Sequence, residues 1–193
     1  MILRDKKIIF VHIPKTAGDS IESALSVPSD EYVKHGYDEE RLVGLGPRGW
    51  AQHYSTDVIQ EIVGVETYMK CYKFTVVRNP WDRFVSSFHY EQQFFGEMDF
   101  DQYVQFPKFA NPQHRLAQTT YIIRPVDYTI RFEELQQGWN HVCERIGLDS
   151  TALPHTNKST RKHYTEYYND ETRKIIADRY HLDIKRYNYK FGE

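Results

Sequence analysis

This sequence has few cysteines and no long apolar run, and it carries little net charge of either sign. Its two cysteines, Cys71 and Cys143, lie far apart and form no CxxC or Cys/His cluster, which argues against a structural zinc site. We expect two buried, reduced thiols, with one long-range disulfide as the other reading. Because no apolar run is long enough to span a bilayer and no signal-peptide core precedes the first strand, the sequence predicts a soluble, cytoplasmic protein without a membrane span.

The lack of a charge excess also narrows the function classes. A formal net charge of −2 with 27% charged residues argues against disorder and against a general nucleic-acid binder. Any phosphate recognition must therefore come from local basic clusters. The 193 residues contain no internal repeat or linker, so we expect one domain over 1–193, large enough to bury a core. The 15 Tyr and 11 Phe suit such a core, and they also suit a groove for a sugar or a base.

Apolar, β-branched runs alternate with segments of helical periodicity along the chain. This alternation predicts an α/β fold, a three-layer α/β/α arrangement around a central parallel sheet. In such folds ligands bind at the carboxyl ends of the strands. The predicted strands are 7–13, 72–77 and 128–132; the predicted helices are 19–26, 56–63, one beginning at Pro80, one through Leu135 and Ile146, and 170–181; loops cover 28–51 and 149–162, and short helices 94–125.

The first strand ends in the most informative motif of the chain. The run Ile8–Ile13 stops at Pro14-Lys15-Thr16-Ala17-Gly18-Asp19-Ser20, and helical spacing resumes at Ile21. A strand, a tight turn and a helix start present backbone N–H groups to an anion, and Lys15 adds a positive charge. Lys15 precedes Gly18, whereas a Walker A lysine follows its last glycine. We therefore predict a phosphate-binding loop of a different kind, in which Thr16 and Ser20 also offer hydroxyl groups; an ordinary strand–helix turn is the alternative.

The second strand ends in Arg78-Asn79-Pro80-Trp81-Asp82-Arg83-Phe84-Val85-Ser86. Arg78 can bind a phosphate through two N–H groups, and Ser86 lies two helical turns further on, where its hydroxyl could reach the same anion. The alternative is an Arg78–Asp82 ion pair with an ordinary helical serine.

Together, the two motifs resemble those of the sulfotransferases that use 3′-phosphoadenosine 5′-phosphosulfate (PAPS), in particular the carbohydrate sulfotransferases. Val11–Gly18 is similar to the family's 5′-phosphosulfate loop, and Phe74–Ser86 to its 3′-phosphate motif. The resemblance implies the P-loop-NTPase-like sulfotransferase fold, PAPS as donor, adenosine 3′,5′-bisphosphate (PAP) as product, and no metal. The donor-binding residues it implies are Lys15, Thr16, Ala17, Gly18, Asp19, Ser20, Arg78 and Ser86.

Asp19 departs from this pattern, because the family carries a small hydroxyl residue there and an acid should repel a phosphosulfate. By the same resemblance, the basic loop after Asn157 closes over the 3′-phosphate, and Arg161 with Lys162 is the expected pair. The alternative is that the segment after Asn157 is an ordinary solvent-exposed basic loop.

The resemblance also places a catalytic histidine at His53. An acceptor hydroxyl must lose a proton as it attacks sulfur, and a neutral imidazole suits that task. We expect Lys15 and His53 to be catalytic and His12 to be structural; His35, His89 and His114 remain rivals for the base.

His114, Arg115 and Gln118 are the candidates for contact with the acceptor, which we expect to be a carbohydrate hydroxyl. Two other functions stay open: a small P-loop-like nucleotide kinase, and a nucleotide-binding protein without catalysis. The sequence lacks a Walker A lysine, which disfavours the kinase.

Overall fold

The computed structural model describes residues 2–3, 7–25, 53–105, 111–150, 152–154 and 161–193 of the chain. These residues form two compact units, each with its own hydrophobic cluster. The sheet unit comprises Met1–Val77 and Thr120–Thr156, and the helical unit comprises Arg78–Thr119 and Asn157–Glu193. The expected loop over 28–51 lies outside the described residues.

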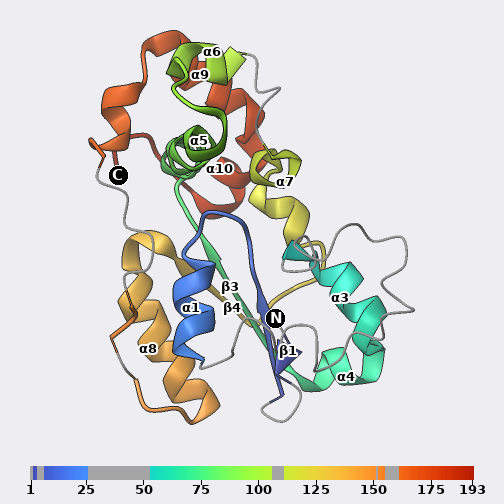
Figure 1. Ribbon diagram of the computed structural model, residues 1–193. Coiled ribbons are helices and arrows are strands. Elements are labelled where there is room, and N and C mark those ends of the chain that lie inside the picture. Colours follow the sequence, from blue (N-terminus) through green and yellow to red (C-terminus); the bar gives the residue numbers. More distant parts are fainter. Residues whose placement is uncertain (1, 4–6, 26–52, 106–110, 151, 155–160) are drawn as a thin grey trace. The chain divides into compact units, whose positions relative to one another are not determined.

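A four-stranded mixed sheet organises the sheet unit (Figure 1). β2 (Ile8–Val11), β3 (Tyr72–Val77) and β4 (Tyr128–Arg131) are parallel neighbours, which confirms the three strands predicted from the apolar runs. β1 (Ile2–Leu3) was not predicted; it pairs antiparallel with β2 at the edge of the sheet. The register pairs Val11 with Thr75, so β2 and β3 end at the same edge of the sheet.

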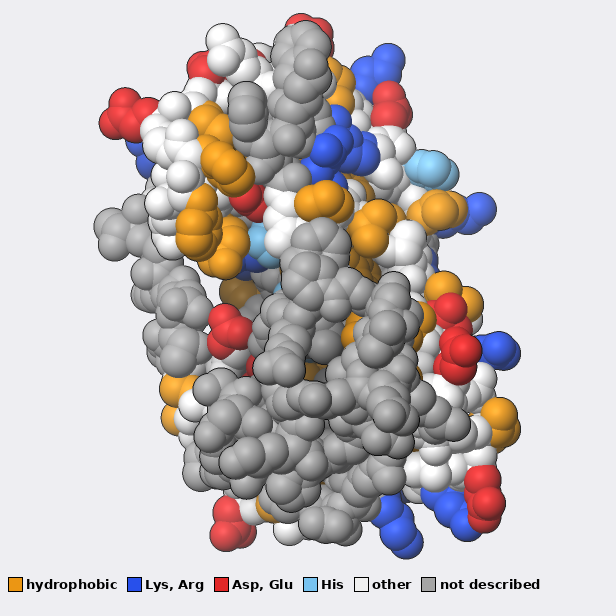
Figure 2. All heavy atoms as spheres, turned by 45° about the vertical axis from the view of Figure 1, so that its right-hand side comes forward, with side chains coloured by type: hydrophobic (Ala, Val, Ile, Leu, Met, Phe, Trp, Pro, Cys, Tyr) orange, Lys and Arg blue, Asp and Glu red, His pale blue; other side chains and the backbone are white. Residues whose placement is uncertain are grey.

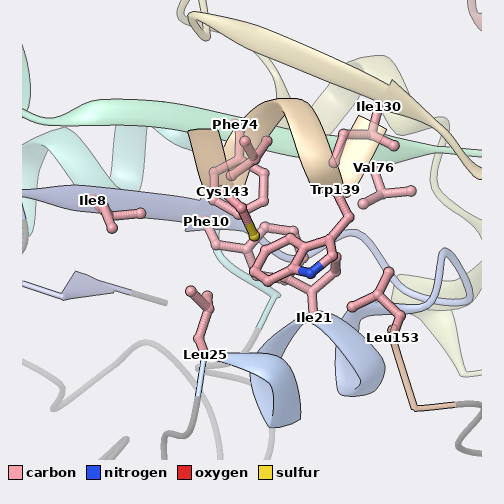
Figure 3. Packing of buried hydrophobic residues seen from close by; sticks show 11 residues of the cluster. Ile8, Phe10, Ile21, Leu25, Phe74, Val76, Ile130, Trp139, Cys143 and Leu153 are labelled. Atoms are coloured by element: carbon pink, nitrogen blue, oxygen red, sulfur yellow. The ribbon is translucent and has the colours of Figure 1, made fainter. Parts of the chain in front are cut away.

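Two helices bury one face of this sheet. α1 (Gly18–Ala24) and α8 (Leu135–Ile146) contribute Ile21, Trp139 and Val142 to a cluster with side chains of β2, β3 and β4 (Figure 3). Cys143 also lies in this cluster, and both cysteines are buried free thiols, as expected.

α3 (Thr56–Val63) and α4 (Val65–Lys70) lie on the other side of the sheet in Figure 1. α3 has the predicted bounds, whereas α4 was not predicted. The 3₁₀ turn η4 (Phe132–Glu134) connects β4 to α8.

The helical unit is built around the long helix α5 (Pro80–Phe95), whose start the sequence predicted. The Asn79 side chain accepts a hydrogen bond from the backbone N–H of Trp81 and donates one to the carbonyl of Lys190. The helix thereby buries Phe84 and Phe88 against Tyr103, Ile176 and other members of an aromatic cluster. The remaining helices are α6 (Phe100–Gln105), α7 (Pro112–Arg115), η3 (Gln118–Tyr121), which leads back to the sheet unit, η5 (Tyr164–Tyr167), α9 (Asp170–Arg179) and α10 (His181–Tyr187).

The surface is mixed in character. Figure 2 shows hydrophobic side chains among basic and acidic ones on the described part of one face, consistent with the small net charge. Phe94 and Phe95, at the end of α5, are among the exposed hydrophobic residues. Within the described ranges, none of the helices has the length and apolar character that crossing a bilayer requires.

Candidate active site

The loop after β2 is a tight turn with two residues in the left-handed region. Lys15 has φ of 67° and Ala17 has φ of 66°, conformations that cost a non-glycine residue about 1–2 kcal/mol. The carbonyl of Ala17 accepts hydrogen bonds from the N–H groups of Ser20 (3.1 Å) and Ile21 (3.2 Å). The turn therefore has a defined shape, and it places the half-buried Lys15 directly after Pro14.

Thr16 has a different role from the one expected for its hydroxyl. Its Oγ1 donates to the carbonyl of Ile13 at 2.8 Å, and the residue is fully buried. The hydroxyl thus closes the turn, which corrects the expectation that it donates to an anion. Only the backbone N–H of Thr16 stays a candidate donor.

A buried histidine–carboxylate pair supports this loop from below. His12 Nδ1 lies 2.8 Å from Glu22 Oε1, and the two residues are 4% and 5% exposed. Gly18 packs on the face of the His12 ring so closely that a Cβ there would lie 1.9 Å from Nε2. Position 18 requires a glycine because its Cα lies so close to the His12 ring. The imidazole of His12 therefore supports the loop by direct packing.

The exposed Asp19 lies in the first turn of α1, whose N-cap is Ala17 and has no side-chain cap. The ligand-type atoms of His12, Asp19 and Glu22 lie within 4.8 Å of one another. Of these, His12 and Glu22 are joined by a hydrogen bond.

His53 lies beside the same histidine. Its Nδ1 is 3.0 Å from the carbonyl oxygen of His12, and the two rings meet edge to face with centroids 4.6 Å apart. Because a carbonyl oxygen can only accept, Nδ1 must carry the proton. In the neutral ring, Nε2 then has the lone pair that a general base uses. Of the rival bases, His35 lies outside the described residues.

The helical unit holds a second cluster of charges, around Asp82. Arg78 Nε and a terminal guanidinium nitrogen each lie 2.8 Å from Asp82 Oδ2, while Arg161 donates to Oδ1. The exposed fractions of the three side chains are 9% for Arg78, 15% for Asp82 and 13% for Arg161. Burial alone would raise the pKa of Asp82, but the two guanidinium groups outweigh it and hold that pKa below its usual value.

From the sequence, an Arg78–Asp82 ion pair was the alternative to phosphate binding by Arg78. The structure contains this pair, and Asp82 also contacts Arg161. One carboxylate is thus shared by two arginines in a largely buried place. Arg161 also has a buried Nη1 atom without a hydrogen-bond partner in the described part of the chain. Such a donor is costly unless something accepts from it, so the cluster suits a phosphate.

The surroundings of Arg161 are open enough for a ligand. A cavity of about 580 Å³ is lined by Arg161, Lys162, Glu166 and Tyr167. The exposed Lys162 therefore faces the same space as Arg161. Ser86 lies one helical turn after Asp82, on the same side of α5.

His89 follows on that side of the helix and accepts from or donates to the Tyr167 hydroxyl at 2.8 Å. Burial, together with the nearby Arg161, lowers the pKa of His89, so this ring is neutral at physiological pH.

Two of the residues expected to contact an acceptor are inside the helical unit instead. His114 is 7% exposed, and its Nδ1 lies 2.9 Å from the buried Glu91 carboxylate. Gln118 is fully buried; its Oε1 accepts from the N–H of Arg78 and its Nε2 donates to the carbonyl of Arg78, both at 2.8 Å. These two side chains shape the segment that begins at Arg78, and we no longer propose them as acceptor contacts. Arg115 is only half-buried and stays a candidate.

Three residues of these clusters orient basic side chains, and of the three only Asp82 had been considered from the sequence, as an ion-pair partner of Arg78. Glu22, Asp82 and Tyr167 each fix the orientation of a basic side chain. The spacing of four residues between Arg78 and Asp82 was a usable signal. No local pattern signals the contact between Arg161 and Asp82, because their separation along the chain is large.

Comparison with known proteins adds a family assignment to this geometry. The family model described as "Sulfotransferase family" matches residues 1–190 of the chain. No curated protein and no solved structure matches it.

Proposed function

This chain belongs to the sulfotransferase family, and we propose that it transfers the sulfuryl group of PAPS to a hydroxyl group of a carbohydrate acceptor. The observation that carries the choice of donor is the pair of arginines on Asp82 in the helical unit. A nucleotide with a separate 3′-phosphate needs a second anion site besides the one for its 5′ end. Arg78 and Arg161, the latter with a buried Nη1 atom that no described residue accepts from, supply the chemistry of such a site.

The loop after β2 is the proposed site for the 5′-phosphosulfate. Lys15 and the backbone N–H groups of Thr16, Ala17, Gly18 and Asp19 are the candidate donors. β2 and β3 end at the same sheet edge, and Arg78 is the residue that follows β3. As in the family that the two motifs resemble, we assign the 5′ end of one nucleotide to the Lys15 loop and its 3′ end to Arg78, Ser86, Arg161 and Lys162. No metal ion is part of this proposal.

PAPS supplies the sulfuryl group and, in PAP, a stable leaving group. The acceptor oxygen forms a bond to sulfur, the bond from sulfur to the phosphate oxygen breaks, and the hydroxyl proton goes to His53 Nε2. The hydrogen bond from His53 Nδ1–H to the carbonyl of His12 keeps the ring in the tautomer that can accept this proton. The ammonium group of Lys15 stabilises the negative charge that develops on the leaving oxygen. Positioning and electrostatics thus account for the rate.

The choice of a carbohydrate as the acceptor is a separate and more specific proposal than the reaction itself. Exposed aromatic side chains such as Phe94 and Tyr90 suit stacking against a sugar ring. A panel of carbohydrate and phenolic acceptors, assayed with radiolabelled donor, tests this part. Transfer to phenols but not to sugars would replace the acceptor class while leaving the reaction intact.

The variant Lys15→Ala tests the reaction itself. We expect it to abolish sulfuryl transfer, whereas Arg78→Ala should chiefly weaken donor binding. Lys174→Ala, which removes an exposed lysine of α9, is the matched control and should leave both unchanged. Full transfer by Lys15→Ala would refute the role of Lys15.

Nucleotide binding distinguishes the competing functions. PAP should raise the melting temperature of the wild-type protein, and ATP with magnesium should not. The reverse pattern would favour a kinase, and PAP binding without transfer to any acceptor would favour a non-catalytic nucleotide-binding protein.

A further inference from the structure

Asp82 is an unexpected residue at the centre of a proposed phosphate site. A carboxylate repels phosphate, so simple electrostatics predicts that its removal would improve binding. However, each of its oxygens is used by a different arginine, Oδ2 by Arg78 and Oδ1 by Arg161. Asp82 therefore joins the start of α5 to a residue that follows the basic loop, far along the chain.

The energetics of two neighbouring guanidinium groups give this bridge a function. Arg78 and Arg161 are both about nine-tenths buried and approach a common carboxylate. Two positive charges this close repel each other, and without a counter-ion at least one side chain would turn toward water. Arg161 is the one that can move, because it lies in an irregular segment before η5, whereas the start of α5 is fixed by Asn79.

The bridge leaves donors for a second anion. A guanidinium group has five N–H donors, and Asp82 takes only some of those on Arg161. Nη1 of Arg161 is buried without a hydrogen-bond partner among the described residues, and this side chain lines the cavity of about 580 Å³. The carboxylate thus holds the two arginines from one side, and Arg161 also borders the cavity.

We propose that Asp82 is a positioning residue that holds Arg78 and Arg161 together as one receptor for the 3′-phosphate of the nucleotide. The inference rests on the proposed function, since it assumes a ligand with a 3′-phosphate. Removing the negative charge of Asp82 should therefore weaken the binding of the 3′-phosphate, although charge alone predicts the opposite. The contribution of Arg161 to binding depends on Asp82.

The test compares two nucleotides that differ only in the 3′-phosphate. Binding of PAP and of adenosine 5′-phosphate is measured by calorimetry for the wild type, Asp82→Asn, Arg161→Gln and the double variant. The ratio of the two affinities isolates the 3′-phosphate. Loss of a charge-assisted contact predicts a ratio about 10- to 100-fold lower in Asp82→Asn, with adenosine 5′-phosphate binding unchanged. Because Arg161 acts through Asp82, Arg161→Gln should lower the ratio no further in the Asp82→Asn background.

Each other outcome is decisive. A ratio that is unchanged or higher in Asp82→Asn would overturn the inference, as would independent, additive effects of the two substitutions. A merely structural role would weaken both nucleotides alike and would leave the ratio at its wild-type value. If the wild type itself does not distinguish the two nucleotides, the proposed function fails, and that result is separate from the behaviour of Asp82.

Two further variants complete the experiment, one as a control and one as a substitute for Asp82→Asn. Asp170→Asn removes the carboxylate of an exposed ion pair with Arg173 and should leave the ratio unchanged. Where Asp82→Asn does not fold, Asp82→Glu keeps the charge but lengthens the side chain by one methylene, so both arginines cannot stay in place. Its ratio should also fall, and a wild-type ratio would again count against the inference.

Discussion

Replacing Gly18 with alanine tests the close contact on which the proposed phosphosulfate loop rests. Gly18 is the first residue of α1 and does not have a positive φ, so an alanine fits its backbone. In a helix without other contacts, this exchange would stabilise the protein by up to about 1 kcal/mol. Here the new Cβ would lie 1.9, 2.1 and 2.3 Å from Nε2, Cδ2 and Cε1 of His12. The His12 ring or the helix must therefore move by more than about 1 Å to reach van der Waals distance.

The packing around the His12 ring determines how much Gly18→Ala destabilises the protein. His12 is 4% exposed and is held at 2.8 Å by the buried Glu22, so it has little room to move. Overpacking of a core costs about 1–3 kcal/mol, and leaving a buried polar group without its hydrogen bond costs about 1–3 kcal/mol. We expect Gly18→Ala to lower the free energy of unfolding by about 3 kcal/mol, in contrast to the gain that propensity alone predicts. Urea-induced unfolding followed by circular dichroism measures this change.

Two comparisons separate the contact from other effects. Gly147→Ala introduces a methyl group at a positive φ of 70° with no atom within 4 Å, so it should cost only the strain of about 1 kcal/mol. In a His12→Ala background the clash is gone, and Gly18→Ala should become neutral or stabilising. A Gly18→Ala protein as stable as the wild type would show that the loop does not rest on His12.

Two further predictions follow from the same clusters. Because the folded-state pKa of Asp82 lies below its ordinary value of 3.8, its ionised form stabilises the folded protein above that pH, and the contribution is lost as the pH falls through the lowered pKa. The stability difference between the wild type and Asp82→Asn should thus shrink on acidification in urea unfolding from about pH 6 to 2, and a difference that does not change with pH would contradict it. His53→Gln should reduce turnover by about 10²- to 10⁴-fold while PAP binding, measured by calorimetry, stays the same; undiminished turnover would remove His53 as the base.

The parts of the fold that local patterns determine could be predicted from the sequence. β2 and β3 are buried parallel strands and therefore appear as continuous apolar, β-branched runs. The repeat of Leu135, Trp139 and Val142 follows the period of a helix, and α8 buries Trp139 and Val142. In contrast, β1 has only two residues and exists because it pairs with Ile8 and Ile9, which no pattern within β1 itself could show. The short helices α4 and α10 likewise follow directly after other helices and lack a periodic stretch of their own.

Some parts of the candidate site could likewise be predicted from the sequence, and others could not. The loop around Lys15 and the turn at Arg78 each depend on a contiguous motif, and both motifs are visible in the sequence. The roles of Gln118 and His114 were misjudged because polar residues are usually at the surface, whereas here the amide of Gln118 and the ring of His114 find buried partners. The link from Asp82 to Arg161 depends on tertiary structure alone.

Each of the two candidate clusters contains a carboxylate that fixes a basic side chain. Glu22 holds His12 beneath Gly18, and Asp82 holds Arg78 and Arg161. Both oxygens of Asp82 are used by the guanidinium groups that they orient, so its charge is largely compensated before a ligand arrives. A phosphate then meets donors that are already ordered, and less binding energy is lost in ordering them. Asp82 should therefore favour anion binding although it shares the anion's charge, because a mobile arginine would bind a phosphate less well than a fixed one. Glu22 acts on the anion only indirectly, through the His12 ring on which Gly18 packs.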